Sequence, residues 1–318
     1  MATTSSERTV AVREIAPARP TRAREVRRAR RGESVVGMLM ASPAVVLLVV
    51  FFVVPVALAF GLAFTNARLI SRRPARVVGF DNFVQLFGDP VFWASLRNTL
   101  YFAAVVVPVQ AGLALVLALL VNAKVRGRNF FRTVYFLPVV TSMVVVSLLW
   151  RFIYQPDGLL NHVIRAVSFG HWQGTDWLNN PDTAMPAIIV LSIWQAVGFH
   201  MIIWLSGLQT IPPELYEAAE LDGTSTWQRF RFVTWPGLLA TRTFILVTIT
   251  IAALSLFTQI SVMTQGGPLD RTTTMVFMAV RTGYEQQQTG YAAAVSLVFF
   301  VFVLLVSAVQ RFVTREKD

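Results

Sequence analysis

Residues 212–236 read PPELYEAAELDGTSTWQRFRFVTWP, and this stretch is the most informative feature of the chain. Pro212 and Pro213 fix the backbone at a helix start, where a missing N–H costs nothing. Glu214 and Glu217 then fall in the first turns, where the positive end of the helix dipole favours carboxylates. The stretch therefore predicts a short helix that begins at the proline pair.

The second half of the stretch predicts a tight turn and another short helix. Gly223 follows the first helix where a left-handed residue commonly ends a helix, a conformation that glycine adopts without strain. Ser225 and Gln228 have the spacing of a capping box, which predicts a new helix start at Ser225. We expect this second helix to end before Pro236.

One face of the first helix is small and acidic. Leu215, Ala218, Ala219 and Asp222 have the spacing of one face, and the two alanines leave it flat enough for close approach. Helices that rest on anionic lipid carry Lys and Arg, whereas residues 212–228 carry carboxylates and no basic residue. A protein partner is therefore favoured over a membrane surface.

Composition places this loop in a membrane protein. Of the 318 residues 55% are hydrophobic, more than a soluble domain of this length buries. The net charge of +11 comes from Arg and Lys residues that flank apolar stretches, where basic residues set the membrane topology. This placement argues against nucleic-acid binding. With no cysteine, disulfides and thiolate metal sites are excluded.

Six stretches are apolar enough to cross a bilayer as helices, which takes about 20 residues. They are Met38 to Phe64, Thr99 to Asn122, Thr133 to Trp150, Ala184 to Leu208, Phe244 to Met263 and Tyr291 to Gln310. The first run continues past Ala57-Leu58-Ala59, so a retained span is favoured over a cleaved signal peptide. The sequence thus predicts an all-α membrane protein with six transmembrane helices.

Basic residues predict the orientation in the cell membrane. With a cytoplasmic amino terminus, 19 of the 28 basic residues lie on the cytoplasmic side, together with both termini and the acidic loop. Residues 1–34 hold nine arginines and no sustained apolar period, so we expect a disordered cytoplasmic tail. The membrane domain is expected over residues 35–318.

The chain shows no catalytic pattern. It contains no Ser/His/Asp set, no H-E-x-x-H and no phosphate-binding glycine loop, which argues against an enzyme. No Asp, Glu or Lys lies deep inside a span, which argues against ion-coupled transport. His200 in the fourth span is a functional candidate, although a hydrogen bond to a neighbouring helix is the favoured interpretation.

Uncharged polar residues occur inside the spans and are candidates for a solute path. They are Ser142, Gln195, Ser255, Gln259 and Ser296. Hydroxyls and amides donate and accept hydrogen bonds, which suits a polar, largely neutral solute. Gln259 follows Ser255 by four positions, which predicts one helical face for both. The competing interpretation is that such residues hold helices together.

The acidic loop resembles the "EAA" signature of binding-protein-dependent ABC importer permeases. Glu217-Ala218-Ala219, Gly223 and Pro236 match the signature at the right spacing, while Val233 and Trp235 stand where it has Ile and Leu. The resemblance implies a coupling loop at about 212–236, in which Glu217, Ala218, Ala219 and Gly223 contact an ATPase subunit.

Other stretches resemble the carbohydrate-type permeases, such as the larger maltose-transporter subunit. They are Gly79-Phe80-Asp81-Asn82-Phe83, Asp89-Pro90, Phe136-Leu137-Pro138, Gly158-Leu159-Leu160-Asn161 and Thr264-Gln265-Gly266-Gly267-Pro268. The resemblance covers roughly residues 35–315, and by position Ser255 resembles the polar solute-binding site in the penultimate span.

This resemblance implies a type I ABC importer permease fold with a cytoplasmic coupling helix. It implies a second homologous permease, two ATPase subunits that hold ATP and Mg, and an extracytoplasmic solute-binding protein. The chain itself is then a transport subunit in the lipid bilayer, with no cofactor, metal or nucleic acid of its own.

Two other classes remain as alternatives. An ion-coupled secondary carrier would carry buried carboxylates or inverted repeats, and a membrane scaffold would need neither an acidic docking turn nor polar residues in its spans. The solute stays open among monosaccharides, disaccharides, amino sugars, polyols and glycerol-phosphate compounds.

Overall fold

The computed structural model describes residues 38–72, 74–123 and 127–314, and it divides into two compact units, Met1–Leu58 and Ala59–Asp318. The predicted tail, residues 1–34, lies outside the described residues. In the described ranges the structure is helical, and the only extended pairing is an isolated bridge between Thr65 and Val77.

Five helices of the described chain are long and apolar enough to cross a membrane, and a bent helix pair makes six if the pair counts as one span. The five are Met38–Leu62, Pro90–Asn122, Ala184–Gln209, Leu239–Met263 and Thr289–Gln310. This confirms the predicted all-α class and five of the six predicted spans to within a few residues at most ends. The first helix contains a π-helical turn, η1 (Val49–Val53), followed by α2 (Val54–Leu62).

The second span, α4 (Pro90–Asn122), begins earlier than the predicted Thr99. Its start is set by Asp89, whose Oδ1 accepts a hydrogen bond from the Val91 amide at 2.8 Å, with Pro90 in the first turn. A short helix, α3 (Asp81–Gly88), precedes it. The predicted apolar stretch began later than the helix, because the first turns of α4 carry polar residues.

The prediction of one straight helix for the third span is wrong. The structure has two helices, α5 (Arg128–Val140) and α6 (Met143–Ile153), and the chain bends by 97° between them. Pro138 lacks an N–H near the end of α5, and its carbonyl accepts from Thr141 N at 3.3 Å and from Gln195 Nε2 at 3.4 Å. The break is therefore stabilised by another span.

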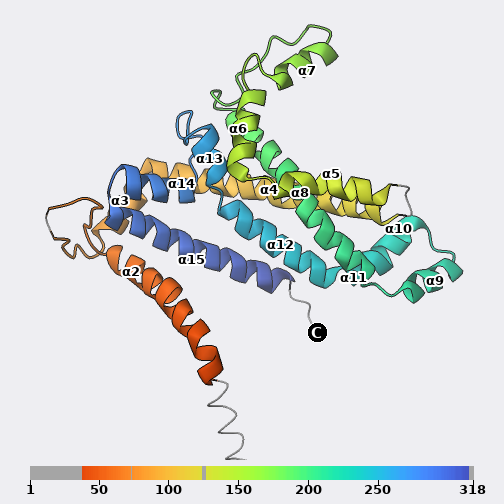
Figure 1. The fold of residues 1–318 in the computed structure, drawn as a ribbon, viewed down its shortest axis with the longest axis horizontal. Coiled ribbons are helices and arrows are strands. Elements are labelled where there is room, and N and C mark those ends of the chain that lie inside the picture. The colour runs from red at the N-terminus through yellow and green to blue at the C-terminus, as the bar shows by residue number, and fades with distance from the viewer. Residues whose placement is uncertain (1–37, 73, 124–126, 315–318) are drawn as a thin grey trace, which may run out of the picture. The chain divides into compact units, whose positions relative to one another are not determined.

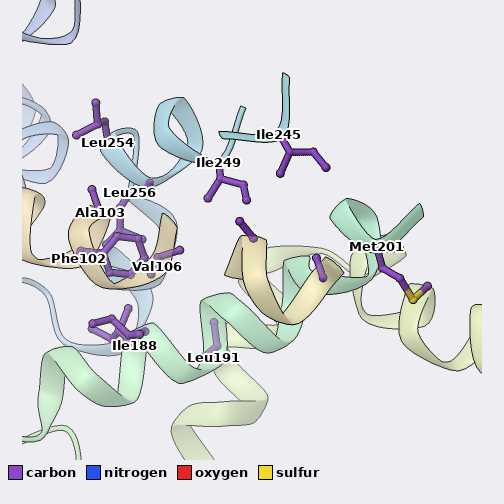
Figure 2. Close-up of a cluster of buried hydrophobic side chains, with 14 of the residues drawn as sticks. Phe102, Ala103, Val106, Ile188, Leu191, Met201, Ile245, Ile249, Leu254 and Leu256 are labelled. Atoms are coloured by element: carbon purple, nitrogen blue, oxygen red, sulfur yellow. The ribbon is translucent and has the colours of Figure 1, made fainter. Parts of the chain in front are cut away.

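Helix α8 (Ala184–Gln209) lies at the centre of the larger unit and packs on α4, α5 and α12 (Leu239–Leu254). Figure 2 shows Phe102 and Val106 of α4 between Leu254 of α12 and Ile188 of α8. All four side chains are buried. Burial of apolar side chains between these three helices fixes the walls that surround the polar residues described below.

The fifth span is interrupted. Helix α12 ends at Leu254, and α13 begins at Thr258 and ends at Met263. The Leu256 carbonyl, which a continuous helix would use internally, accepts from Thr274 Oγ1 at 2.7 Å. Thr274 caps the next helix, α14 (Met275–Val280), which continues as η3 (Arg281–Glu285) before the last span, α15 (Thr289–Thr314).

The segment between the third and fourth spans is organised by one asparagine. Asn161 of α7 (Leu159–Val167) is fully buried. Its Nδ2 donates to the carbonyls of Gln155, Pro156 and Thr175, and its Oδ1 accepts from Trp172 Nε1, Trp177 Nε1 and Thr175 N. One amide therefore holds this segment together without a β-sheet or a disulfide.

Within the larger unit, two groups of short connecting helices lie at opposite ends of the long helices. Figure 1 shows α9 (Pro213–Leu221), α10 (Thr226–Arg229) and α11 (Trp235–Gly237) together at one end, and α3 and α14 at the other. The acidic loop is thus separated from the α3–α14 end by the length of the spans.

Candidate functional site

The acidic loop forms the helix, turn and helix that its sequence predicts. Helix α9 begins at Pro213, and Gly223 closes the turn with a left-handed φ of +69°. The turn folds the chain back, so that Thr224 donates to the Ala219 carbonyl from its amide at 3.1 Å and from its hydroxyl at 2.6 Å. The position of the second helix relative to α9 therefore depends on the backbone of Gly223.

The second helix starts as predicted but ends later. Ser225 and Gln228 form both bonds of the capping box, at 3.3 and 2.7 Å. From α10 the chain continues through a π-helical turn, η2 (Phe230–Thr234), into α11, so the expected end before Pro236 is wrong. In the wider π-helical turn, Trp235 N bonds to the Phe230 carbonyl. Pro236 then lies in the first turn of α11, where a residue without an N–H is tolerated.

The predicted flat face of α9 is only partly exposed. Leu215, Ala218 and Asp222 are exposed, whereas Ala219 is 8% exposed because the returning chain covers it. Leu221 at the tip is 90% exposed. The surface offered to a partner therefore consists of Ala218 and its neighbours, while Ala219 supports the turn from inside.

The charge of this surface is almost uncompensated. Glu214, Glu217 and Asp222 form no ion pair within the described residues, and Glu220 approaches Arg229 only at 3.8 Å. An exposed pair at this distance contributes little to stability. The loop thus presents acidic and apolar side chains together, which suits a basic or polar protein groove better than anionic lipid.

A cavity of about 280 Å³ lies between α4, α8, α12 and the segment that follows α12. Its polar lining residues are Gln110, Ser192, Gln195, His200, Ser255, Thr258 and Gln259. Its apolar lining includes Phe102, Val106, Met143 and Phe257. No lining side chain is Asp, Glu, Lys or Arg, so the cavity is polar without a carboxylate, ammonium or guanidinium group.

Three of the five predicted path residues meet in this cavity. Gln195, Ser255 and Gln259 line it. Ser142 lies instead at the start of α6, where the third span bends. Ser296 bonds to the Ala292 carbonyl of its own helix at 2.9 Å and does not line the cavity.

The expectation that Ser255 and Gln259 share one helical face is wrong. The helix is broken between them, at Leu256 and Phe257, for the reason given above. They nevertheless line the same cavity, because α13 resumes beside α6 and α8. Gln259 Nε2 also donates to Ser192 Oγ on α8 at 3.3 Å, a long hydrogen bond.

Gln110 and Ser192 were not among the predicted path residues, and His200 was favoured only as a helix contact. Gln110 Nε2 lies 2.8 Å from His200 Nδ1, which confirms the predicted bond to a neighbouring helix. Both residues also line the cavity, as does Ser192. The sequence feature that could have identified these residues is the same as for the predicted ones: an uncharged polar side chain inside an apolar span.

Metal binding finds no support at this site. Within the described ranges, no three histidine or carboxylate side chains come together as metal ligands.

Residues 110–317 match the family described as "Binding-protein-dependent transport system inner membrane component". The lactose transport system permease protein of Rhizobium radiobacter is 35% identical, over 91% of this chain and 97% of that protein. The sulfoquinovosyl glycerol transport system permease protein of Agrobacterium fabrum is 34% identical, over 90% and 92%.

A solved structure shares the fold. It is the crystal structure of a bacterial ABC transporter involved in the import of the acidic polysaccharide alginate. A chain of that structure superposes with a TM-score of 0.78 and 24% identity, over 92% of this chain and 98% of that one. The predicted importer permease fold is therefore confirmed.

Proposed function

Because the chain belongs to the family of binding-protein-dependent transport system inner membrane components, we propose that it carries a neutral carbohydrate or a similar polyhydroxyl solute as one permease of an ATP-driven importer. The lactose system named above carries a solute of this kind, whereas sulfoquinovosyl glycerol bears a sulfonate in addition to its hydroxyls. The observation that carries the proposal is the polar, neutral cavity between the spans.

The absence of charged side chains from the cavity lining limits which solutes the cavity can bind. Seven polar side chains and several apolar ones surround about 280 Å³, and none is a carboxylate, Lys or Arg. A phosphate or carboxylate in a water-poor cavity needs a compensating charge, whereas hydroxyls need only hydrogen-bond partners. Neutral sugars and polyols therefore fit the cavity better than glycerol-phosphate compounds.

The acidic loop supplies the coupling to ATP. In this proposal α9 enters a groove of one of two ATPase subunits, which hold ATP and Mg, and Glu217, Ala218, Ala219 and Gly223 shape the contact. A second permease completes the path, and an extracytoplasmic binding protein delivers the solute. Both termini and the loop are cytoplasmic in this arrangement, as the basic residues predict.

The test is reconstitution of the whole complex, with the second permease, the ATPase subunits and the binding protein, into proteoliposomes. We expect uptake of radiolabelled neutral sugars, lactose among them, that requires both ATP and the binding protein, and no uptake of glycerol 3-phosphate. Uptake driven by a proton or sodium gradient without ATP would support the secondary carrier instead.

Replacement of exposed Ala218 by Trp should weaken ATPase binding. A large ring on the exposed side of α9 prevents close approach, and we expect co-purified ATPase to fall by about tenfold, or ~1.4 kcal/mol. Val163→Trp, at an exposed position of α7, is the matched control and should leave the yield unchanged. Full ATPase yield with Ala218→Trp would remove this face from the interface.

The double replacement Ser255→Ala with Gln259→Leu should slow uptake severalfold. Each lost hydrogen bond to a neutral solute costs about 0.5 to 1.5 kcal/mol. Ser296→Ala, which lies off the cavity, is the control with unchanged uptake. Complex yield is measured beside uptake, because a loss of assembly together with transport would show that the pair only holds helices together.

A further inference from the structure

The cavity contains a buried pair of polar side chains that the predicted path does not use. Gln110 on α4 is 3% exposed and His200 on α8 is 5% exposed. Their contact, between Gln110 Nε2 and His200 Nδ1, is 2.8 Å long. Both residues line the cavity, so the pair is a helix contact and part of the wall at the same time.

Two groups compete for Nδ1 of His200. The Gln110 amide nitrogen at 2.8 Å is a donor, and the Ala196 carbonyl at 3.1 Å is an acceptor. A neutral imidazole nitrogen either accepts or donates, so it satisfies only one of them. The Ala196 carbonyl already accepts the backbone N–H of His200 within α8, whereas the Gln110 amide has no other acceptor among the described residues. Nδ1 therefore accepts, and the proton is on Nε2.

This assignment leaves two polar atoms for the cavity. Within the described ranges, neither His200 Nε2 nor Gln110 Oε1 has a hydrogen-bond partner. One is a donor and the other an acceptor. A hydroxyl group both donates and accepts, so the two atoms together match the hydroxyls of a polyol or sugar.

We propose that His200 donates a hydrogen bond to the solute from Nε2, and that Gln110 is the positioning residue that fixes the imidazole in this tautomer. The inference rests on the proposed function. It adds a determinant of specificity on α4 and α8, beside Ser255 and Gln259 near the end of the fifth span.

Cysteine accessibility tests whether this wall faces the path. The chain has no cysteine, so each introduced thiol in this subunit is read without background. The complex carrying His200→Cys, or the milder Ala196→Cys, is treated with trimethylammonium-ethyl methanethiosulfonate in proteoliposomes. Met201→Cys is the control, because Met201 is fully buried and points away from Phe102 and Val106 (Figure 2).

We expect both wall variants to react and the Met201 variant to stay unreactive. Alternating access predicts that the rate changes by about tenfold between the nucleotide-free and the vanadate-trapped complex. Ala196→Cys covers the case in which His200→Cys fails to assemble. No reaction at either wall position in either state would overturn the proposal.

The tautomer is tested by solid-state NMR of the complex labelled with ¹⁵N-histidine, with His200→Gln subtracted to isolate one ring. We expect Nε2 to be protonated in the wild type. In Gln110→Leu the ring should change tautomer, because Nδ1–H then donates to the Ala196 carbonyl. An unchanged tautomer in Gln110→Leu would overturn the positioning role.

The two proposals fail separately. If ATP-driven uptake works and the wall does not react, only the role of His200 is lost. If the wall reacts and the tautomer shifts but uptake proves independent of ATP, the importer proposal is lost and the solute contact stands.

Discussion

Gly223→Val is expected to abolish ATP-driven uptake while the protein still inserts and assembles. Gly223 has a φ of +69°, and no atom lies within 4 Å of the position that a Cβ would occupy. The cost is therefore conformational and not steric, about 1–2 kcal/mol or more for a β-branched residue. Relaxing this strain moves the turn that carries the bonds from Thr224 to the Ala219 carbonyl.

The measurement is uptake and ATP hydrolysis in the same proteoliposomes. We expect hydrolysis without uptake for Gly223→Val, and near-normal uptake for Gly223→Asn, because asparagine tolerates the left-handed region. Gly88→Val is the matched control, since Gly88 also has open space around it and no positive φ. Normal uptake by Gly223→Val would show that coupling does not depend on this turn.

Gly198→Ala is expected to have the largest effect on assembly. An added Cβ on α8 would overlap the Tyr135 carbonyl of α5 and come within 3.2 Å of Phe136 Cα. Backbone atoms cannot rotate away, so the two helices must separate, and overpacking of this kind costs about 1–3 kcal/mol or more. Helix α5 would then lose its close packing against α8.

Thermal unfolding of the purified complex in detergent measures this effect. Gly198→Ala should lower the melting temperature by several degrees and reduce the yield. Gly112→Ala on α4 is the control, because no atom lies within 4 Å of its Cβ position and alanine favours the helix by up to about 1 kcal/mol. Equal stability of the two variants would contradict the close α5–α8 contact.

Local sequence was enough to predict the helix, turn and helix of the acidic loop. The proline start, the left-handed Gly223 and the Ser225 capping box all act within a few residues, and each appears in the structure. The burial of Ala219 could not be read from helical spacing. It depends on where the returning chain lies after the turn.

The breaks in the spans required information from distant residues. Apolar counts correctly predicted where the spans lie. They do not register that Gln195 binds the Pro138 carbonyl, or that Thr274 binds the Leu256 carbonyl. At each break a polar side chain far along the sequence hydrogen-bonds to a backbone carbonyl near the break.

The cavity was predicted only in part for a similar reason. Polar residues in apolar spans were the signal for a solute path, and Gln195, Ser255 and Gln259 line one cavity, while their contact with a solute stays a prediction. The same signal marked Ser296, which turns back on its own helix, and did not lead to Gln110. Only the packing of α4 against α8 distinguishes the residues that face the cavity.

The bend in the third span has a consequence for how the protein is made. Helices α5 and α6 have 13 and 11 residues, and each is too short to cross a bilayer, which takes about 20 residues. The partner that stabilises their junction, Gln195, is synthesised later than both. During synthesis the Pro138 carbonyl therefore has only Thr141 N as a partner until the fourth span has been made, and the contact that joins the bend to α8 forms last.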